Sequence, residues 1–175
     1  MGAIDEIIEA PLSPQALGAR FREFCDDPRF ANLPGKIELD VWGRIVMSPA
    51  SNLHGLLQMR LGQRLAPLGG QAFAEASVLT PSGVLVSDVA WGSAELVRAH
   101  RAETPFTRAP ELCIEVVSPS NARKELEEKI AAHLAAGAKE VWIVLPKSQR
   151  VEVFGTDGPL ASTAYAVDLA GLFDF

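Results

Sequence analysis

The sequence has few cysteines, no long apolar run and no secretory signal. Cys25 and Cys113 are the two cysteines among 175 residues, so a disulfide framework is not expected. No run approaches the roughly 18 apolar residues that a membrane-spanning helix needs. The N-terminus carries acids in place of the basic and then apolar pattern of a signal peptide. We therefore predict a cytoplasmic protein that does not contact a membrane.

Several common motifs of ligand binding and catalysis are also missing. The chain contains no Gly-rich phosphate-binding loop, no cluster of Cys and His with zinc-ligand spacing, and no G-x-S-x-G turn. Its 16 basic and 22 acidic residues give a net charge of −6. An acidic chain does not favour indiscriminate binding of nucleic acid, although a local basic groove is compatible with it.

The patterns that are present predict one α/β domain over residues 1–175, in which a mixed sheet is flanked by helices. Hydrophobic periodicity, caps and turn residues predict helices at 13–26, 51–66, 92–100 and 122–136, and strands at 36–41, 44–47, 71–80, 84–91, 112–117, 139–145 and 150–154. This order favours a mixed sheet with a core over about residues 36–154. The N-terminal helix and the C-terminal tail are expected to pack on that core.

The stretch Glu111–Gly137 is central to the functional interpretation. Its strand, LCIEVV, surrounds Glu115 with apolar residues. Burying an unpaired charge is costly, so Glu115 needs a metal, another cation or a proton. Asp88 stands in the same situation within VLVSDVAW, a second apolar strand. The two acids are therefore expected on neighbouring central strands.

The helix after the Glu115 strand supplies a candidate cation. Successive residues of a helix are rotated by about 100° around its axis. If Leu126 is placed at 0°, Ile130 and Leu134 lie on the same face of the helix. Lys129 lies at about −60°, on the border of that face, whereas Lys124 lies almost opposite and is expected to point to water. His133 falls on the apolar face, where we expect a core histidine.

Two acids and a lysine in this arrangement suit phosphodiester hydrolysis. Two close carboxylates repel each other, and one takes a proton unless a cation intervenes. Mg²⁺ typically binds one or two carboxylates and keeps several waters, and Mn²⁺ is an alternative. The metal lowers the pKa of water and stabilises the charge that develops on a phosphate, while a nearby ammonium orients the water.

These segments resemble the PD-(D/E)XK nuclease superfamily, and more closely its Uma2-like branch, which is described as bacterial restriction endonucleases of unknown function. The matching stretches are GRIVMSPASNLHGLLQMRLGQRL, SDVAW, EVVSPS, EKIAAHLAAGAKEVWIVLP and RVEVF. The resemblance implies a restriction-endonuclease-like fold in which Asp88 and Glu115 bind the metal. It also implies that the lysine of the E-X-K motif has migrated to Lys129, since Val117 stands at its usual position.

Two positions depart from the family pattern, and neither is a predicted metal ligand. Ser87 stands where the family usually has proline, and His133 stands where tyrosine is common. The family often has an acid in the first strand pair, and Glu38 is its counterpart here. His54, at the start of the second helix, matches a family position, where a capping or structural role competes with a catalytic one.

We interpret the chain as a Mg²⁺- or Mn²⁺-dependent endonuclease that hydrolyses phosphodiester bonds, with DNA as its partner. Asp88, Glu115 and Lys129 are its predicted catalytic residues. Two alternatives stay open. One is a nuclease fold that has lost catalysis and binds nucleic acid or protein, which the acidic net charge favours. The other is a metal-dependent hydrolase of a different phosphate substrate.

Two surface predictions accompany this interpretation. Double-strand cleavage by one small domain needs two active sites, so we predict a homodimer. The apolar tail LAGLF and the hairpin around Val151 and Phe154 are its expected contact surfaces. Arg60 and Arg64, four positions apart on the second helix, are expected to form a solvated face in preference to a phosphate contact.

Overall fold

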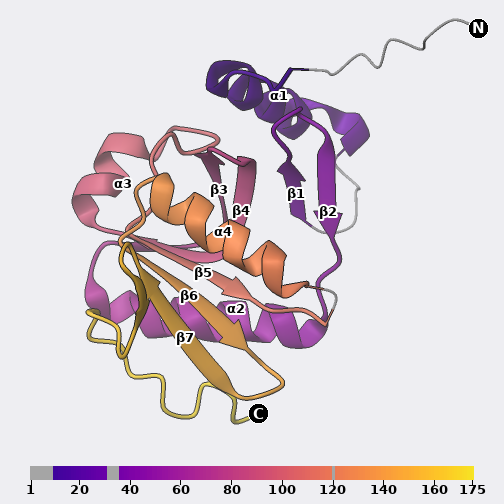
Figure 1. Cartoon of the computed structure of the whole chain (residues 1–175). Helices are drawn as coiled ribbons and strands as arrows, with labels where there is room; N and C mark the ends of the chain where they lie inside the picture. The colour runs from indigo at the N-terminus through magenta and orange to yellow at the C-terminus, as the bar shows by residue number, and fades with distance from the viewer. Residues whose placement is uncertain (1–9, 31–35, 120) are drawn as a thin grey trace, which may run out of the picture.

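The computed structural model describes residues 10–30, 36–119 and 121–175, and in this part the chain forms an eight-stranded mixed sheet flanked by helices (Figure 1). The helices are α1 (Pro14–Asp26), α2 (Asn52–Leu65), α3 (Ala94–His100) and α4 (Arg123–Ala135). The strands are β1 (Lys36–Leu39), β2 (Ile45–Ser48), β3 (Gln71–Thr80), β4 (Gly83–Gly92), β5 (Leu112–Val116), β6 (Glu140–Leu145), β7 (Arg150–Gly155) and β8 (Gly158–Leu160). Short 3-10 turns occupy Pro28–Phe30 and Ala66–Leu68.

The predicted fold class is confirmed. The sheet has the order β2-β1-β4-β5-β6-β7-β8, and β3 pairs with β4 outside this path. Strands β5 and β6 are parallel and are joined through α4, while the other pairs are antiparallel. Strand β8 was not predicted. Residues 31–35, between the first predicted helix and the first predicted strand, and Ser120, in the EVVSPS stretch, lie outside the described residues, as do the first nine residues.

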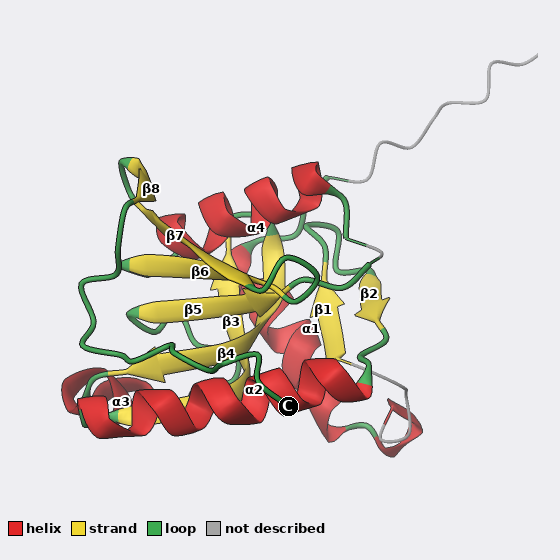
Figure 2. Cartoon of the chain, turned by 90° about the horizontal axis from the view of Figure 1, so that it is seen from below, coloured by secondary structure: helices red, strands yellow, loops and turns green. Residues whose placement is uncertain are grey.

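Helices α4 and α2 cover opposite faces of the sheet (Figure 2). Side chains alternate along β5, so that Leu112, Ile114 and Val116 join the core beneath α2, whereas Cys113 joins the core beneath α4. Glu115 therefore lies on the α4 face. This alternation explains how an acid in an apolar strand comes to point toward the helix that carries Lys129.

Helix α2 buries a narrower stripe than its sequence predicted. Ser51 caps the helix, and Leu57, Leu61 and Leu65 are fully buried at four-residue spacing. The apolar spacing of this helix predicts Leu53 and Leu56 on the same face, but they are 42% and 51% exposed. Leu56 lies beside the buried row that repeats every fourth position, whereas Leu53 begins that row in the first turn of the helix, before its buried part.

The C-terminal tail completes the core beneath α2. Leu172 is buried against the α2 leucines and Trp142, with Leu169 and Phe173 partly buried around it. Arg60 donates to the carbonyls of Gly171 and Leu172, and Arg64 donates to that of Asp168. The prediction of a solvated arginine face was wrong, because these guanidinium groups satisfy tail carbonyls. In the described ranges, none of the helices is both long and apolar enough to cross a bilayer.

Candidate functional site

The site occupies a gap along one edge of β4. On this edge, β4 pairs with β1 only at Leu39–Val84 and with β5 only from Val89–Ile114 onward. Between these points charged side chains take the place of a neighbouring strand. Glu38 accepts from the backbone N–H of Val86 (2.9 Å), and Lys36 donates to the Val86 carbonyl (2.7 Å). Buried backbone groups need such partners, so the gap in the sheet creates a polar site inside the core.

Asp88 stands where β4 and β5 begin to separate. Its Oδ2 accepts from the backbone N–H of Val116 (2.7 Å), and its Oδ1 lies 2.8 Å from Nζ of Lys36 and 3.2 Å from Nε2 of His54. Its neighbour Ser87 is also fully buried, and the Ser87 hydroxyl contacts the backbone of Ile114 across the strands. The Asp88 carboxylate is therefore held in place through one oxygen, while the other faces the Lys36 ammonium and the His54 ring.

Glu115 lies beside Asp88, one position beyond the last paired residues of β4 and β5. Its Oε2 is 3.5 Å from both Lys36 Nζ and Lys129 Nζ, and its Oε1 is 3.2 Å from His133 Nε2. Burial by itself raises the pKa of Glu115, but the ammonium groups of Lys36 and Lys129 outweigh burial and hold this pKa well below its usual range. Glu115 is thus an ionised carboxylate surrounded by cations.

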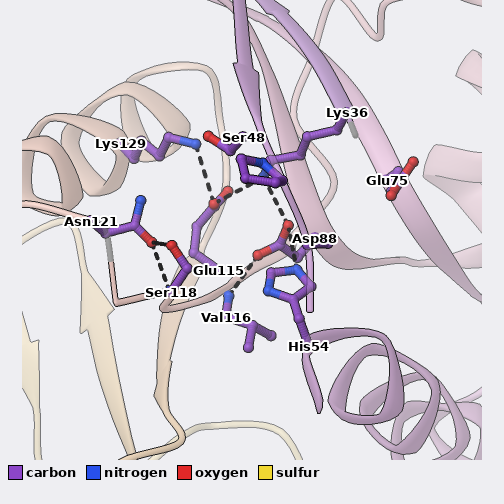
Figure 3. Close-up of a pocket in the computed structure, with 12 residues that line it drawn as sticks. Lys36, Ser48, His54, Glu75, Asp88, Glu115, Val116, Ser118, Asn121 and Lys129 are labelled. Atoms are coloured by element: carbon purple, nitrogen blue, oxygen red, sulfur yellow. Dashed lines mark hydrogen bonds and ion pairs between the residues drawn. The ribbon is translucent and has the colours of Figure 1, made fainter. Parts of the chain in front are cut away.

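Lys36 was not predicted as a site residue, yet its ammonium lies at the centre of the cluster (Figure 3). Its Nζ atom contacts Asp88 at 2.8 Å, Glu115 at 3.5 Å and Glu38 at 3.8 Å. Burial lowers the pKa of this amine, but the three carboxylates outweigh it and the pKa is raised. The signal for Lys36 was its spacing from Glu38, because residues two apart on a strand share one face.

Lys129 reaches the cluster from α4, as its position on the helix predicted. Its Nζ atom donates to both oxygens of Glu38, at 2.9 and 3.0 Å, and lies 3.5 Å from Glu115. Burial lowers the pKa of Lys129, but Glu115 and Glu38 outweigh it and raise the pKa. Lys124 is solvent-exposed beside Glu128. The buried face of α4 includes Lys129 itself, so this lysine lies deeper than the predicted border.

His133 is part of the cluster and not a separate core residue. Its ring is fully buried, with Nε2 at 3.2 Å from Glu115. Within the described ranges, its Nδ1 is the one buried side-chain N or O atom without a hydrogen-bond partner. Burial lowers the pKa of His133, but the neighbouring Cys113 and Glu115 side chains outweigh it and raise the pKa to about 10. Its position four residues after Lys129 on the same helix face could have indicated this contact.

Helix α2 places the ring of His54 next to Asp88. The backbone N–H of His54 donates to the capping hydroxyl of Ser51, while its ring contacts Asp88. Gln58, one turn later, donates to the Asp88 carbonyl (3.1 Å). The backbone and the side chain of His54 therefore have separate contacts, one within the helix cap and one with the acid.

Glu75 lines the same cavity and was not predicted. Its neighbours Ala74 and Ala76 pair with Val89 and Ser87, so Glu75 stands across from Asp88 in the β3–β4 register. Its φ is +54°, a left-handed conformation that costs a non-glycine residue about 1–2 kcal/mol. Figure 3 shows its side chain beyond Asp88, on the side away from Glu115.

The structure therefore brings all five predicted residues into one neighbourhood, and it separates them into two groups. Asp88 and Glu115 meet at Lys36, with His54 beside Asp88. Glu38 contacts Lys129 and β4, and not Asp88. The cavity at this point is lined by residues that include Ser48, Ser118 and Asn121. A ligand in it would meet the two central carboxylates directly.

The two central carboxylates suit a cation that prefers oxygen ligands. Asp88 and Glu115 already converge on one positive charge, the Lys36 ammonium. In the described part of the chain, no group of three or more His, Cys, Asp and Glu side chains has the arrangement of a metal site. A closed zinc cage of four protein ligands is therefore not formed here. Mg²⁺ needs only one or two carboxylates because it retains several waters, and the pair present satisfies that need.

Comparison with known proteins gives the same fold. The Uma2 family model, described as “Putative restriction endonuclease”, matches residues 20–168. Among solved structures, the chain is similar to one described as “a putative nuclease belonging to DUF820” from Anabaena variabilis ATCC 29413. The two are 20% identical with a TM-score of 0.57, over 82% of this chain and 94% of that chain. No curated protein matches. Since the family model spans most of the sequence, the chain belongs to the Uma2 family of restriction-endonuclease-like proteins.

Proposed function

We propose that the chain is a divalent-metal-dependent endonuclease that hydrolyses phosphodiester bonds in DNA. The observation that carries the proposal is the convergence of the Asp88 and Glu115 carboxylates on one cation position at a cavity wall, with Lys129 beside them. Membership of the Uma2 family supports nuclease chemistry. Two buried acids and a buried lysine match what that chemistry needs.

Asp88 and Glu115 would hold Mg²⁺ or Mn²⁺ through Oδ1 and Oε2, the oxygens that now face Lys36. When bound, the ion supplies positive charge that stabilises the transition state and lowers the pKa of the attacking water. The other oxygen of each acid is held by the protein, in Asp88 by the Val116 N–H and in Glu115 by His133. Both acids are thereby oriented before any ligand arrives, which reduces the reorganisation needed during catalysis.

Lys129 would orient the attacking water and stabilise negative charge on the phosphate. Glu38 fixes its ammonium with two hydrogen bonds, at 2.9 and 3.0 Å, and leaves it 3.5 Å from Glu115. An ammonium has three donors, and the third, which faces Glu115, would turn to the water or the phosphate. His54 contacts Asp88 from α2 and would help to fix the orientation of that acid.

Incubation of the purified full chain with supercoiled plasmid, with and without Mn²⁺, tests the proposal. We expect metal-dependent conversion to nicked or linear plasmid, and loss of conversion in Asp88→Asn. A matched control is Asp157→Asn, which changes an acid in the turn between β7 and β8. Cleavage that persists equally in EDTA, or in Asp88→Asn, would contradict the assignment of the site.

Two other functions make different predictions in this experiment. A nuclease fold that only binds nucleic acid or protein is favoured by the net charge of −6, and it need not take up Mn²⁺. A hydrolase of another phosphate substrate would bind Mn²⁺ and leave the plasmid intact. Metal titration identifies the first function, and profiling with phosphate mono- and diesters identifies the second.

A further inference from the structure

The ammonium of Lys36 occupies the position between the two central acids. Its Nζ atom lies 2.8 Å from Oδ1 of Asp88 and 3.5 Å from Oε2 of Glu115, and it donates to the Val86 carbonyl at 2.7 Å. The side chain is 10% exposed, so these contacts are shielded from solvent. Figure 3 shows Lys36 reaching the acids from β1, opposite to the approach of Lys129 from α4.

Lys36 touches the same oxygens that the proposed function assigns to the metal. Oδ2 of Asp88 and Oε1 of Glu115 are held by Val116 and His133, which leaves Oδ1 and Oε2 to face a cation. A divalent ion at these oxygens would lie next to an ammonium at hydrogen-bond distance. Like charges in a poorly solvated site repel strongly, so the two cations cannot share the oxygens.

Lys129 cannot replace Lys36 in this position. Two of its hydrogen bonds go to Glu38, and its distance to Glu115 is 3.5 Å. Lys36, in contrast, has Asp88 as its nearest carboxylate. Both lysines therefore face Glu115, but of the two only Lys36 contacts Asp88.

We propose that Lys36 is an internal competitor for the divalent cation, so that metal uptake requires the Lys36–Asp88 ion pair to open. The inference rests on the proposed metal site and adds a regulatory element to it. Without metal, Lys36 holds the two acids together through its contacts with both carboxylates. With metal, the ion takes over that role and the Lys36 ammonium leaves the shared oxygens. Lys36 is thus a positioning residue that exchanges with the ligand.

Competition predicts opposite effects on two measurements when the charge of Lys36 is removed. In Lys36→Met, the acids of the metal-free protein lose their counter-charge, so its melting temperature should fall. The same variant should bind Mn²⁺ more tightly, with a Kd lower by on the order of tenfold, a typical size for coupling between two binding events. A lysine with a purely structural role would lower the melting temperature without tightening metal binding.

The experiment compares Mn²⁺ affinity by calorimetry, and melting temperature in EDTA and in Mn²⁺, for four full-length proteins. These are the parent, Lys36→Met, Lys36→Arg and the exposed-lysine control Lys124→Met. We expect tighter binding and a larger Mn²⁺-induced shift only in Lys36→Met. Lys36→Arg retains a cation and should bind Mn²⁺ no more tightly than the parent.

Each of the other outcomes contradicts the competition, and they differ in whether the metal site fails with it. If Lys36→Met binds Mn²⁺ no more tightly than the parent, while Asp88→Asn abolishes binding, competition is wrong and the metal site stands. If the parent binds no Mn²⁺, or Asp88→Asn binds it unchanged, the proposed metal site and the competition both fail. If Lys36→Met stays unfolded even in saturating Mn²⁺, the metal cannot substitute for the ammonium, and competition is again overturned.

Discussion

The Nζ atom of Lys129 lies 2.9 Å from Oε1 of Glu38, a residue 91 positions earlier in the chain. This ion pair links α4 to β1 across the gap in the sheet, and both side chains are buried. Removing one partner of a buried pair leaves the other charge unpaired and typically costs about 3–5 kcal/mol. Loss of cleavage in a Lys129 variant could therefore arise from chemistry or from damage to the fold, and the two must be separated.

Replacing Lys129 together with its partner Glu38 separates the effect on chemistry from the effect on the fold. We expect Lys129→Met to lose stability, because Glu38 is left unpaired, and to lose cleavage by about 10²–10⁴-fold, the usual value of a positioned proton-transfer group. Adding Glu38→Gln should recover much of the stability without restoring cleavage. Urea unfolding and plasmid cleavage measure the two effects. Lys124→Ala is the surface control, and full cleavage by the double variant would remove Lys129 from the mechanism.

Asp88→Asn should abolish the stabilisation that divalent metal gives to the folded protein. A ligand that binds only the folded state stabilises it by about 2.7 kcal/mol at 100 times its Kd. Because Asp88 also pairs with Lys36, the variant should melt lower even without metal. The informative quantity is therefore the difference in melting temperature with and without Mn²⁺. An undiminished difference in Asp88→Asn would exclude Asp88 as a ligand.

His133 should make the metal-free protein less stable as the pH rises. Its folded-state pKa of about 10 exceeds the unfolded value of about 6.5, so its contribution is complete below pH 6.5 and is lost as the pH approaches 10. Between pH 6.5 and pH 9, the contribution of His133 to the free energy of unfolding falls by at most about 3 kcal/mol. The pKa values of Lys36 and Lys129 are raised as well, so their contributions persist until the pH exceeds about 10.4.

The variant His133→Tyr tests this dependence, since a phenol can donate to Glu115 but stays neutral through pH 9. Denaturant unfolding in EDTA between pH 6.5 and 9 should show a steeper loss of stability in the parent than in the variant. The buried thiol of Cys113 is present in both proteins, so its effect on the comparison is shared. Equal slopes would show that His133 does not carry the charge that its surroundings favour.

Glu75 should be replaceable by glycine with a gain in stability. Its left-handed backbone costs about 1–2 kcal/mol, whereas glycine loses about 0.5–1 kcal/mol through greater chain entropy. The expected net gain is about 0.5–1 kcal/mol for Glu75→Gly in denaturant unfolding. Glu75→Ala removes the same carboxylate but keeps the strained conformation, so it should show no gain. If both variants gain equally, the carboxylate and not the backbone is the source of the cost.

The homodimer remains a prediction, but its expected surfaces change. Leu172 and Val151 pack against the core of their own chain, so the tail and this hairpin are largely occupied. Large exposed apolar side chains occur instead on α2 and on the edge strand β2, including Leu56, Met59 and Val46. We expect sedimentation equilibrium to show a dimer that Met59→Asp weakens. Only monomer at high micromolar concentration would count against the prediction.

The sequence predicted the acids and the helix lysine because each stands out against its own segment. Asp88 and Glu115 interrupt apolar strands, and helical periodicity placed Lys129 near the sheet. Lys36 was missed because it begins a short strand of mixed character, where a lysine is unremarkable. Its position depends on the gap between β1 and β5, which is a property of strand pairing and not of any one segment.

The exposed leucines of α2 and the arginine contacts were missed for a related reason. Periodicity gives the direction of a side chain around its helix, but not the length or width of the surface that meets the helix. Leu53 lies outside that surface, and Arg60 meets a tail from the other end of the sequence. Long-range partners of this kind decide burial, and local patterns do not contain them.

Helix α2 joins the C-terminal tail to the carboxylate cluster. His54 and Gln58 in its first turns contact Asp88, while Arg60 and Arg64 further along bind the carbonyls of residues 168–172. A continuous hydrogen-bonded helix moves as a stiff rod, so displacement of the tail is transmitted to the groups that hold Asp88. A bulky fusion at the C-terminus would thus displace α2 and shift the position of Asp88. A cleavable tag at the N-terminus would leave the contacts between the tail, α2 and Asp88 unchanged.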